Sequence, residues 1–193
     1  MPGTSTRNCI VEKADTLFYE SGFEATSFAD IAAAVGISRG NFYHHFKSKD
    51  DILDAVITLR IDRTRALLDR WQDDADTPSE RILSFIHMLI GNRAKIMAFG
   101  CPVGTLCSEL AKLDHVAQTR AAAILRLFRD WLSTQFQALG AGDRSDALAL
   151  HLLSWSQGVA VMATAFRDEA FIHREVAGIA QWLTDLPDLS QPH

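Results

Sequence analysis

The chain has 193 residues, and its 48% hydrophobic content is enough for a folded core, which excludes general disorder. Its formal net charge of −5 excludes a protein that coats nucleic acid by bulk positive charge, so DNA binding would require a local basic patch. The sequence has no apolar run of about 18 residues and no apolar signal-peptide core, so we expect a cytoplasmic protein without a membrane span.

Three short helices are expected within the first fifty residues. The first covers residues 8–21, where apolar residues recur at helical spacing, and it ends at Gly22. The second begins at Ser27, because Ser27 and Asp30 have the spacing of a capping box. The third begins at Ser38 and ends near residue 46. A turn joins the second helix to the third, and this arrangement is typical of a helix-turn-helix.

The segment 37–49 is basic although the protein is acidic elsewhere. It contains one arginine, two lysines and no acid. Phe42 and Phe46 are four residues apart, so both would point inward from one face of a helix. The outward positions would then be Arg39, Gly40, Asn41, Tyr43, His44 and Lys47. Such side chains can bind guanine, adenine and phosphates, but an ordinary solvated face has the same composition, and these residues alone leave both interpretations open.

Longer helices are expected in the remainder, which makes an all-α protein of about nine helices. We place a three-helix DNA-binding domain at residues 1–50 and a second helical domain at residues 51–193. Thr77 to Glu80 is a strong start signal, because a cap is followed by a proline and an acid. The longer helices are expected at about residues 49–74, 77–99, 106–112, 115–139, 144–167 and 169–183.

Residues 25–53 closely resemble the DNA-binding signature of the TetR family. The matching elements include Val-Gly-Ile-Ser at residues 35–38 and Tyr-His-His-Phe at residues 43–46, and the resemblance covers about the first quarter of the chain. It implies that phosphates are held by Thr26, Tyr43, His45 and Lys49. It also places five residues at or near base edges, namely Ser38, Arg39, Gly40, Asn41 and His44. We include the cap residue Ser27 in this interface, and expect Arg7 to be a flexible arm or a further DNA contact.

The resemblance implies that the remainder binds a small-molecule effector and forms a homodimer. The last two long helices would pair with those of a second copy in a four-helix interface. Their composition permits this, because Gly158 and other small residues accompany the apolar stripe of the helix at 144–167. An ordinary monomer core is the alternative. A dimer would place two recognition helices roughly 34 Å apart, as successive major-groove faces require.

An effector pocket needs apolar walls and a few polar groups. The candidates are the large apolar residues of the second domain, with one amide and one thiol. They are Phe85, Met88, Leu89, Asn92, Phe99, Cys101, Leu106, Phe128, Trp131, Trp155 and Phe166. Most residues of this kind simply form the core of any helical protein, and that remains the alternative for each of them.

The three cysteines, Cys9, Cys101 and Cys107, are an odd number, so we expect free thiols rather than a disulfide framework. Cys101 lies in a Gly-Cys-Pro break between helices, a segment that resembles one in TetR-like regulators that sense electrophiles or oxidants. The alternative is a small packing group. No Cys-x-x-Cys or paired His-Cys spacing is present, so no metal site and no cofactor is expected.

The sequence has no phosphate loop, nucleophile elbow or metalloprotease motif, so an enzyme is not expected. We predict a ligand-responsive homodimeric repressor that binds a palindromic double-stranded DNA operator. One alternative is a repressor switched by electrophiles or oxidants at Cys101. Another is a helical protein that binds a small molecule without binding DNA.

Overall fold

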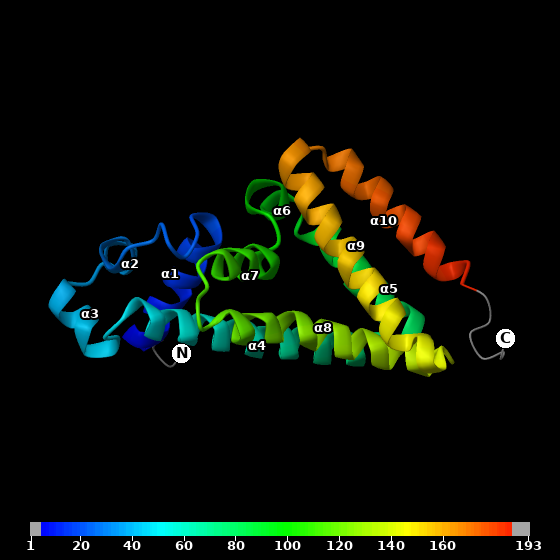
Figure 1. The fold of residues 1–193 in the computed structure, drawn as a ribbon, viewed down its shortest axis with the longest axis horizontal. Coiled ribbons are helices and arrows are strands. Elements are labelled where there is room, and N and C mark those ends of the chain that lie inside the picture. Colours follow the sequence, from blue (N-terminus) through cyan, green and yellow to red (C-terminus); the bar gives the residue numbers. More distant parts are fainter. Residues whose placement is uncertain (1–4, 187–193) are drawn as a thin grey trace. The chain divides into compact units, whose positions relative to one another are not determined.

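The structure is a computed structural model that describes residues 5–186, without the side chain of Arg39. The described part of the chain is all-α, as predicted, and Figure 1 draws its helices. They are α1 (Thr6–Glu20), α2 (Phe28–Val35), α3 (Arg39–His45), α4 (Lys49–Asp74), α5 (Pro78–Gly91), α6 (Arg93–Phe99), α7 (Pro102–Lys112), α8 (Gln118–Ala138), the 3-10 helix η1 (Gly142–Arg144), α9 (Ser145–Phe166) and α10 (Glu169–Thr184).

The described residues thus form ten α-helices where about nine were expected, because the predicted helix at 77–99 is divided. Asn92 is the C-cap residue of α5, with φ −104° and ψ 8°. Its side-chain amide donates a hydrogen bond to the Met88 carbonyl oxygen at 3.0 Å. Asparagine often ends helices in this way, because its side chain competes with the backbone for hydrogen bonds.

The chain divides into two compact units. Unit 1 consists of residues 1–63 and 105–124 and contains α1, α2, α3, the start of α4, most of α7 and the start of α8. Its core extends beyond the domain boundary predicted at residue 50, because Val56 and Ile57 of α4 and Leu106 and Leu110 of α7 are buried in it. A three-helix segment that stopped at residue 50 would leave those apolar contacts unmade.

Unit 2 consists of residues 64–104 and 125–193 and contains α5, α6, α9, α10 and parts of α4 and α8. The helices α9 and α10 lie side by side, and α10 also packs on α5 (Figure 1). By length and composition, the straight stretch Gly142–Phe166 is the one described helix that could span a membrane, but core helices of globular proteins meet the same criteria. α9 packs against α5, α6 and α10.

Candidate nucleic-acid interface

The helix α3 is fixed at both ends by local contacts. Ser38 caps its first turn, where the serine Oγ accepts the Asn41 N–H at 3.3 Å. Phe42 and Phe46 are 1% and 3% exposed, so both point into the core of unit 1, as their spacing predicted. The Phe42 ring packs edge-on against Phe28 of α2 with 5.3 Å between ring centroids. These contacts fix which face of α3 points to solvent.

The outward face of α3 carries most of the residues predicted to read DNA. Gly40, Asn41 and His44 are exposed, and the Tyr43 side chain is 55% exposed with its ring 5.8 Å from that of Phe28. A Cβ at Gly40 would meet no atom within 4 Å, so the backbone there is open to a close approach. The side chain of Arg39 lies outside the described residues.

Two predicted contacts at the start of α2 have different roles in the structure. Thr26 is 3% exposed, and its hydroxyl donates to the Gly22 carbonyl oxygen at 2.7 Å. In this structure the Thr26 side chain is therefore used inside unit 1, and its expected phosphate contact stays a prediction. Ser27 is exposed and forms the predicted capping box, in which its Oγ accepts the Asp30 N–H at 3.2 Å and the Asp30 carboxylate accepts the Ser27 N–H at 2.8 Å.

Lys49, which is also expected to hold a phosphate, has partners within unit 1. Its Nζ donates to the carbonyl oxygens of Phe23 at 3.0 Å and Glu24 at 3.2 Å, and lies 4.4 Å from the Phe23 ring centroid. The side chain is 24% exposed. In this structure the ammonium group binds backbone carbonyls within unit 1. Local sequence spacing could not indicate this contact, because the two carbonyls are 25 and 26 residues away in the chain.

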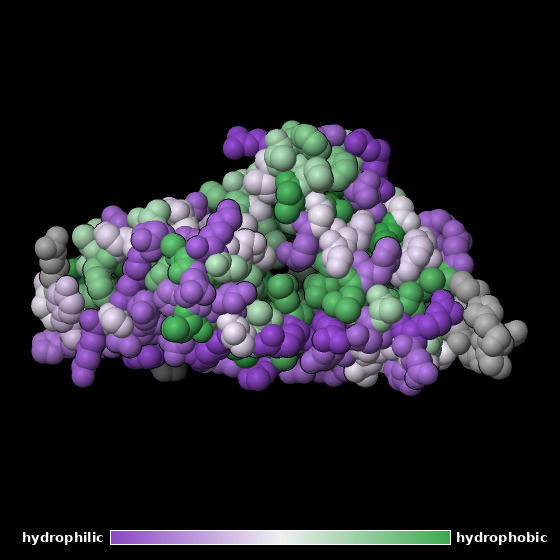
Figure 2. All heavy atoms as spheres, in the orientation of Figure 1, coloured by the Kyte–Doolittle hydropathy of each residue, from purple (hydrophilic) through white to green (hydrophobic). Residues whose placement is uncertain are grey.

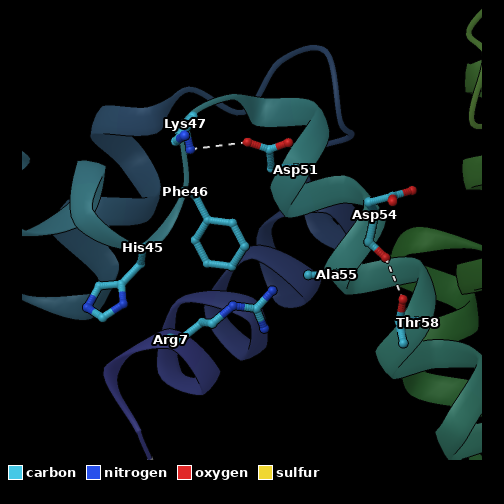
Figure 3. A pocket seen from close by; sticks show the side chains of 8 residues that line it. All are labelled: Arg7, His45, Phe46, Lys47, Asp51, Asp54, Ala55 and Thr58. Carbon is cyan, nitrogen blue, oxygen red and sulfur yellow. Dashed lines mark hydrogen bonds between the residues drawn. The ribbon is translucent and has the colours of Figure 1, made fainter.

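An open groove of about 400 Å³ lies beside α3 (Figure 3). His45 is half-buried and lines it together with Lys47, whose N–H donates to the Asp51 carboxylate at 3.2 Å. Arg7 enters the groove from α1, and its guanidinium carbon lies 4.8 Å from the centroid of the Phe46 ring. The expectation of a flexible arm is wrong for Arg7, which belongs to the first turn of α1. The groove thus places the Arg7 guanidinium next to α3, together with Lys47 and the carboxylates of Asp51 and Asp54.

The predicted effector residues are only partly brought together. Phe85, Phe128 and Trp131 form an aromatic cluster in unit 2 with Trp71, which was not among the predicted residues. Neighbouring ring centroids are 5.7–6.4 Å apart. Leu89 is buried, whereas Met88, Phe99 and Trp155 are half-buried. The four aromatic residues come from α4, α5 and α8, and therefore only the folded structure identifies Trp71 as a member.

Three predicted effector residues lie elsewhere. Leu106 belongs to the core of unit 1, Asn92 is the exposed cap of α5, and Phe166 is 69% exposed at the end of α9. Cys101 is half-buried, and its Sγ accepts the Gly104 N–H at 3.4 Å in the first turn of α7. The other two cysteines, Cys9 and Cys107, are likewise half-buried and form no disulfide.

The family model that describes bacterial regulatory proteins of the tetR family matches residues 10–56. These residues run from α1 into α4 and include the whole of α3 with its two buried phenylalanines. The chain belongs to the TetR family.

Solved structures of similar fold align with nearly all of this TetR-family chain. A TetR transcriptional regulator from Legionella pneumophila has a TM-score of 0.84 and 27% sequence identity, with 94% of this chain and 99% of that chain covered. The TetR family is one of regulatory proteins and not of enzymes.

Two curated relatives match shorter regions. The HTH-type transcriptional repressor DhaR of Mycobacterium sp. (strain GP1) is 29% identical over 133 residues, which are 68% of this chain and 64% of that protein. The HTH-type transcriptional regulator UidR of Escherichia coli (strain K12) is 36% identical over 104 residues, which are 49% of this chain and 52% of that protein. The chain therefore covers less than two thirds of the length of either relative.

Proposed function

We propose that this TetR-family protein is a transcriptional repressor that binds a palindromic DNA operator as a homodimer and releases it in response to a small molecule. The observation that carries the proposal is the outward face of α3, where Asn41, Tyr43 and His44 are exposed above two buried phenylalanines. Amide, phenol and imidazole groups are suited to base edges and phosphates in the major groove. The DhaR relative is itself named a repressor. We expect such a regulator to act in the cytoplasm.

The surface of α9 supports the dimer. Its exposed positions bear no acid, lysine or arginine and are apolar or small at several successive turns. The exposed large apolar residues are Leu150, Val161, Met162 and Phe166. Figure 2 shows hydrophobic side chains gathered at the surface where α9 ends and α10 begins. Contiguous exposed apolar surface of this kind marks an interaction site in a soluble protein, and a second copy of α9 and α10 would cover it.

The aromatic cluster of unit 2 supports an effector site. Trp131 Nε1 is buried and has no hydrogen-bond partner among the described residues. Leaving a buried donor unpaired is unfavourable by about 1–3 kcal/mol, so a ligand that brings an acceptor would gain that interaction. We therefore expect an aromatic or largely apolar effector with a carbonyl, ether or carboxylate oxygen. Trp131→Phe should weaken the response to such a molecule, with Trp182→Phe as the matched control, because Trp182 packs against Phe136 and His151 outside the cluster.

The test of DNA binding uses the full chain and a random-sequence duplex pool. Repeated selection should enrich one palindromic sequence, and its affinity should fall steeply with salt, with a log–log slope of about −0.9 for each phosphate contact. Tyr43→Ala should reduce this affinity at least tenfold. If no sequence is enriched and no duplex binds at low salt, the chain is a helical protein that binds a small molecule without DNA.

A switch at Cys101 is the second candidate for the input signal. It is favoured by the position of the thiol, which is half-buried and accepts a backbone N–H in the first turn of α7. Cys101→Ser keeps an acceptor for that N–H but removes the thiol. N-Ethylmaleimide should then release DNA from the wild type and from the Cys9→Ser control but not from Cys101→Ser. Equal release from Cys101→Ser would eliminate the thiol switch.

A further inference from the structure

The two residues Phe23 and Glu24 connect α1 to α2, and both of their backbone N–H groups bind one carboxylate. The Phe23 N–H donates to Glu109 Oε2 and the Glu24 N–H to Glu109 Oε1, each at 2.9 Å. Gly22, just before them, has φ +91°, and a Cβ there would lie 3.1 Å from Glu109 Oε1. A glycine therefore allows both the backbone conformation and the close approach of the carboxylate. The contact is bidentate and charge-assisted.

The carbonyl groups of the same two residues bind one ammonium group. Lys49 Nζ lies 3.0 Å from the Phe23 oxygen and 3.2 Å from the Glu24 oxygen, and it also faces the Phe23 ring. All four backbone polar groups of this dipeptide are thus bound by two side chains of opposite charge. We call Glu109 and Lys49 the 23–24 clamp. The Phe23 side chain is 2% exposed, which further fixes the dipeptide in the core of unit 1.

The two members of the 23–24 clamp come from helices that each have one end outside unit 1. Lys49 is the first residue of α4, which continues to Asp74, and Glu109 belongs to α7, which begins at Pro102. Unit 2 includes residues 64–104, and therefore parts of both helices. The clamped dipeptide ends three residues before Ser27, the cap of α2. A displacement of either helix would consequently act on the backbone just ahead of the helix-turn-helix.

We propose that the 23–24 clamp fixes the backbone ahead of α2 and thereby positions the helix-turn-helix for DNA. This inference rests on the proposed function and names two residues that DNA binding would need. Glu109 and Lys49 are positioning residues here, which set the start of α2 and through it the placement of α3. Lys49 therefore affects DNA affinity by holding the protein backbone, and not by neutralising a phosphate.

The first experiment compares Glu109→Gln with wild type by amide hydrogen exchange. A glutamine offers one acceptor oxygen, so one of the two N–H groups would face an amide donor. We expect exchange at Phe23 or Glu24 to become at least tenfold faster. Glu80→Gln is the matched control, because Glu80 also accepts a backbone N–H, from Thr77 at 2.9 Å, but in the capping box of α5. Unchanged protection at both residues in Glu109→Gln would overturn the clamp.

The second experiment measures affinity for the duplex that the wild type selects. Glu109→Gln should lower the affinity at least tenfold, whereas Glu80→Gln should change it less than twofold. If the amides of residues 23 and 24 lose protection but affinity changes less than twofold, the clamp does not position the helix-turn-helix. A wild type that selects no duplex would overturn the proposed function, while the exchange experiment would still test the clamp itself.

Lys49→Met separates the clamp from a phosphate contact and serves where Glu109→Gln fails to fold. Methionine retains an apolar stem against the Phe23 ring and loses the charge. If the clamp is correct, Lys49→Met binds DNA more weakly, but the slope of affinity against salt is unchanged. The double variant Glu109→Gln/Lys49→Met should lose no more DNA affinity than the weaker of the two single variants, because both residues hold the same dipeptide. A slope reduced by about 0.9 would assign Lys49 to a phosphate and overturn its role in the clamp.

Discussion

Arg60 of α4 and Asp15 of α1 form an ion pair in which Arg60 Nε lies 2.6 Å from Asp15 Oδ1. Arg60 is only 7% exposed. The second oxygen of Asp15 accepts Arg63 Nη1 at 3.0 Å, so the carboxylate joins α1 to α4 through two arginines. The helix that carries Arg7 is thereby fixed to the helix that carries Lys49.

Asp15→Asn should destabilise unit 1 by about 3 kcal/mol, because removing one partner leaves a buried charge uncompensated. Unfolding in urea, followed by circular dichroism, measures the change. Glu12→Gln is the control, since the ion pair of Glu12 with Arg63 is about half-exposed on both sides and should contribute less than about 1 kcal/mol. If Asp15→Asn and Glu12→Gln lose the same free energy of unfolding, the burial of Arg60 does not determine how much the ion pair stabilises unit 1.

Lys47→Gln should lower the salt dependence of DNA binding. Lys47 is exposed at the end of α3 beside the groove that Arg7 enters. If it neutralises one phosphate, the log–log slope of affinity against salt becomes shallower by about 0.9, for selected and mixed-sequence duplexes alike. Fluorescence anisotropy at several salt concentrations gives the slope. Lys95→Gln, at an exposed lysine of α6, is the control, and an identical slope in both variants would remove Lys47 from the interface.

The capping box of α5 predicts a dependence of stability on pH. The Thr77 hydroxyl and backbone N–H groups bind the Glu80 carboxylate and hold its pKa below the ordinary 4.5. Because the pKa is lower in the folded protein, this contribution is present above pH 4.5 and is lost as the pH falls through the folded pKa. The stability difference between wild type and Glu80→Gln, measured by urea unfolding, should therefore be present at about pH 6 and shrink as the pH falls below 4.5. A difference that grows on acidification would contradict this assignment.

Local signals in the sequence predicted local structure correctly. The spacing of Phe42 and Phe46 indicated the buried face of α3, and Ser27 with Asp30 indicated the start of α2, because each pattern involves residues within one helical turn. The break at Asn92 was missed because an asparagine within an apolar stretch ends a helix only when its side chain binds the backbone, as it does here with Met88.

Contacts between distant residues could not be predicted in this way. Glu109 binds backbone groups 85 and 86 residues away, and Lys49 binds carbonyls from the other side of the helix-turn-helix. The family resemblance implies a phosphate contact for Lys49, but a signature of residue types does not show the backbone partners that Lys49 has in this chain. Leu106 was predicted to line an effector pocket, but it belongs to the core of unit 1. The hydrophobicity of a residue does not indicate whether it joins the core of unit 1 or that of unit 2.

Gly158→Leu should dissociate the proposed dimer without unfolding the monomer. Gly158 is exposed in the middle of α9, and a Cβ there would meet no atom within 4 Å, so one copy has room for the larger side chain. Replacing glycine within a helix also favours the helix by up to about 1 kcal/mol. Between two copies of α9, however, the isobutyl group would prevent close approach of the helices.

Sedimentation equilibrium at micromolar concentration should then give twice the chain mass of 21.4 kDa for wild type and the chain mass for Gly158→Leu. Gly91→Leu is the matched control, because Gly91 is also an exposed helical glycine with open space around its Cα, but it ends α5. The Gly158→Leu variant should keep the wild-type melting temperature. It should lose more affinity for a palindromic duplex than for a duplex with one half-site, since only a dimer reaches two half-sites. A Gly158→Leu protein that remains fully dimeric would place the interface away from the centre of α9.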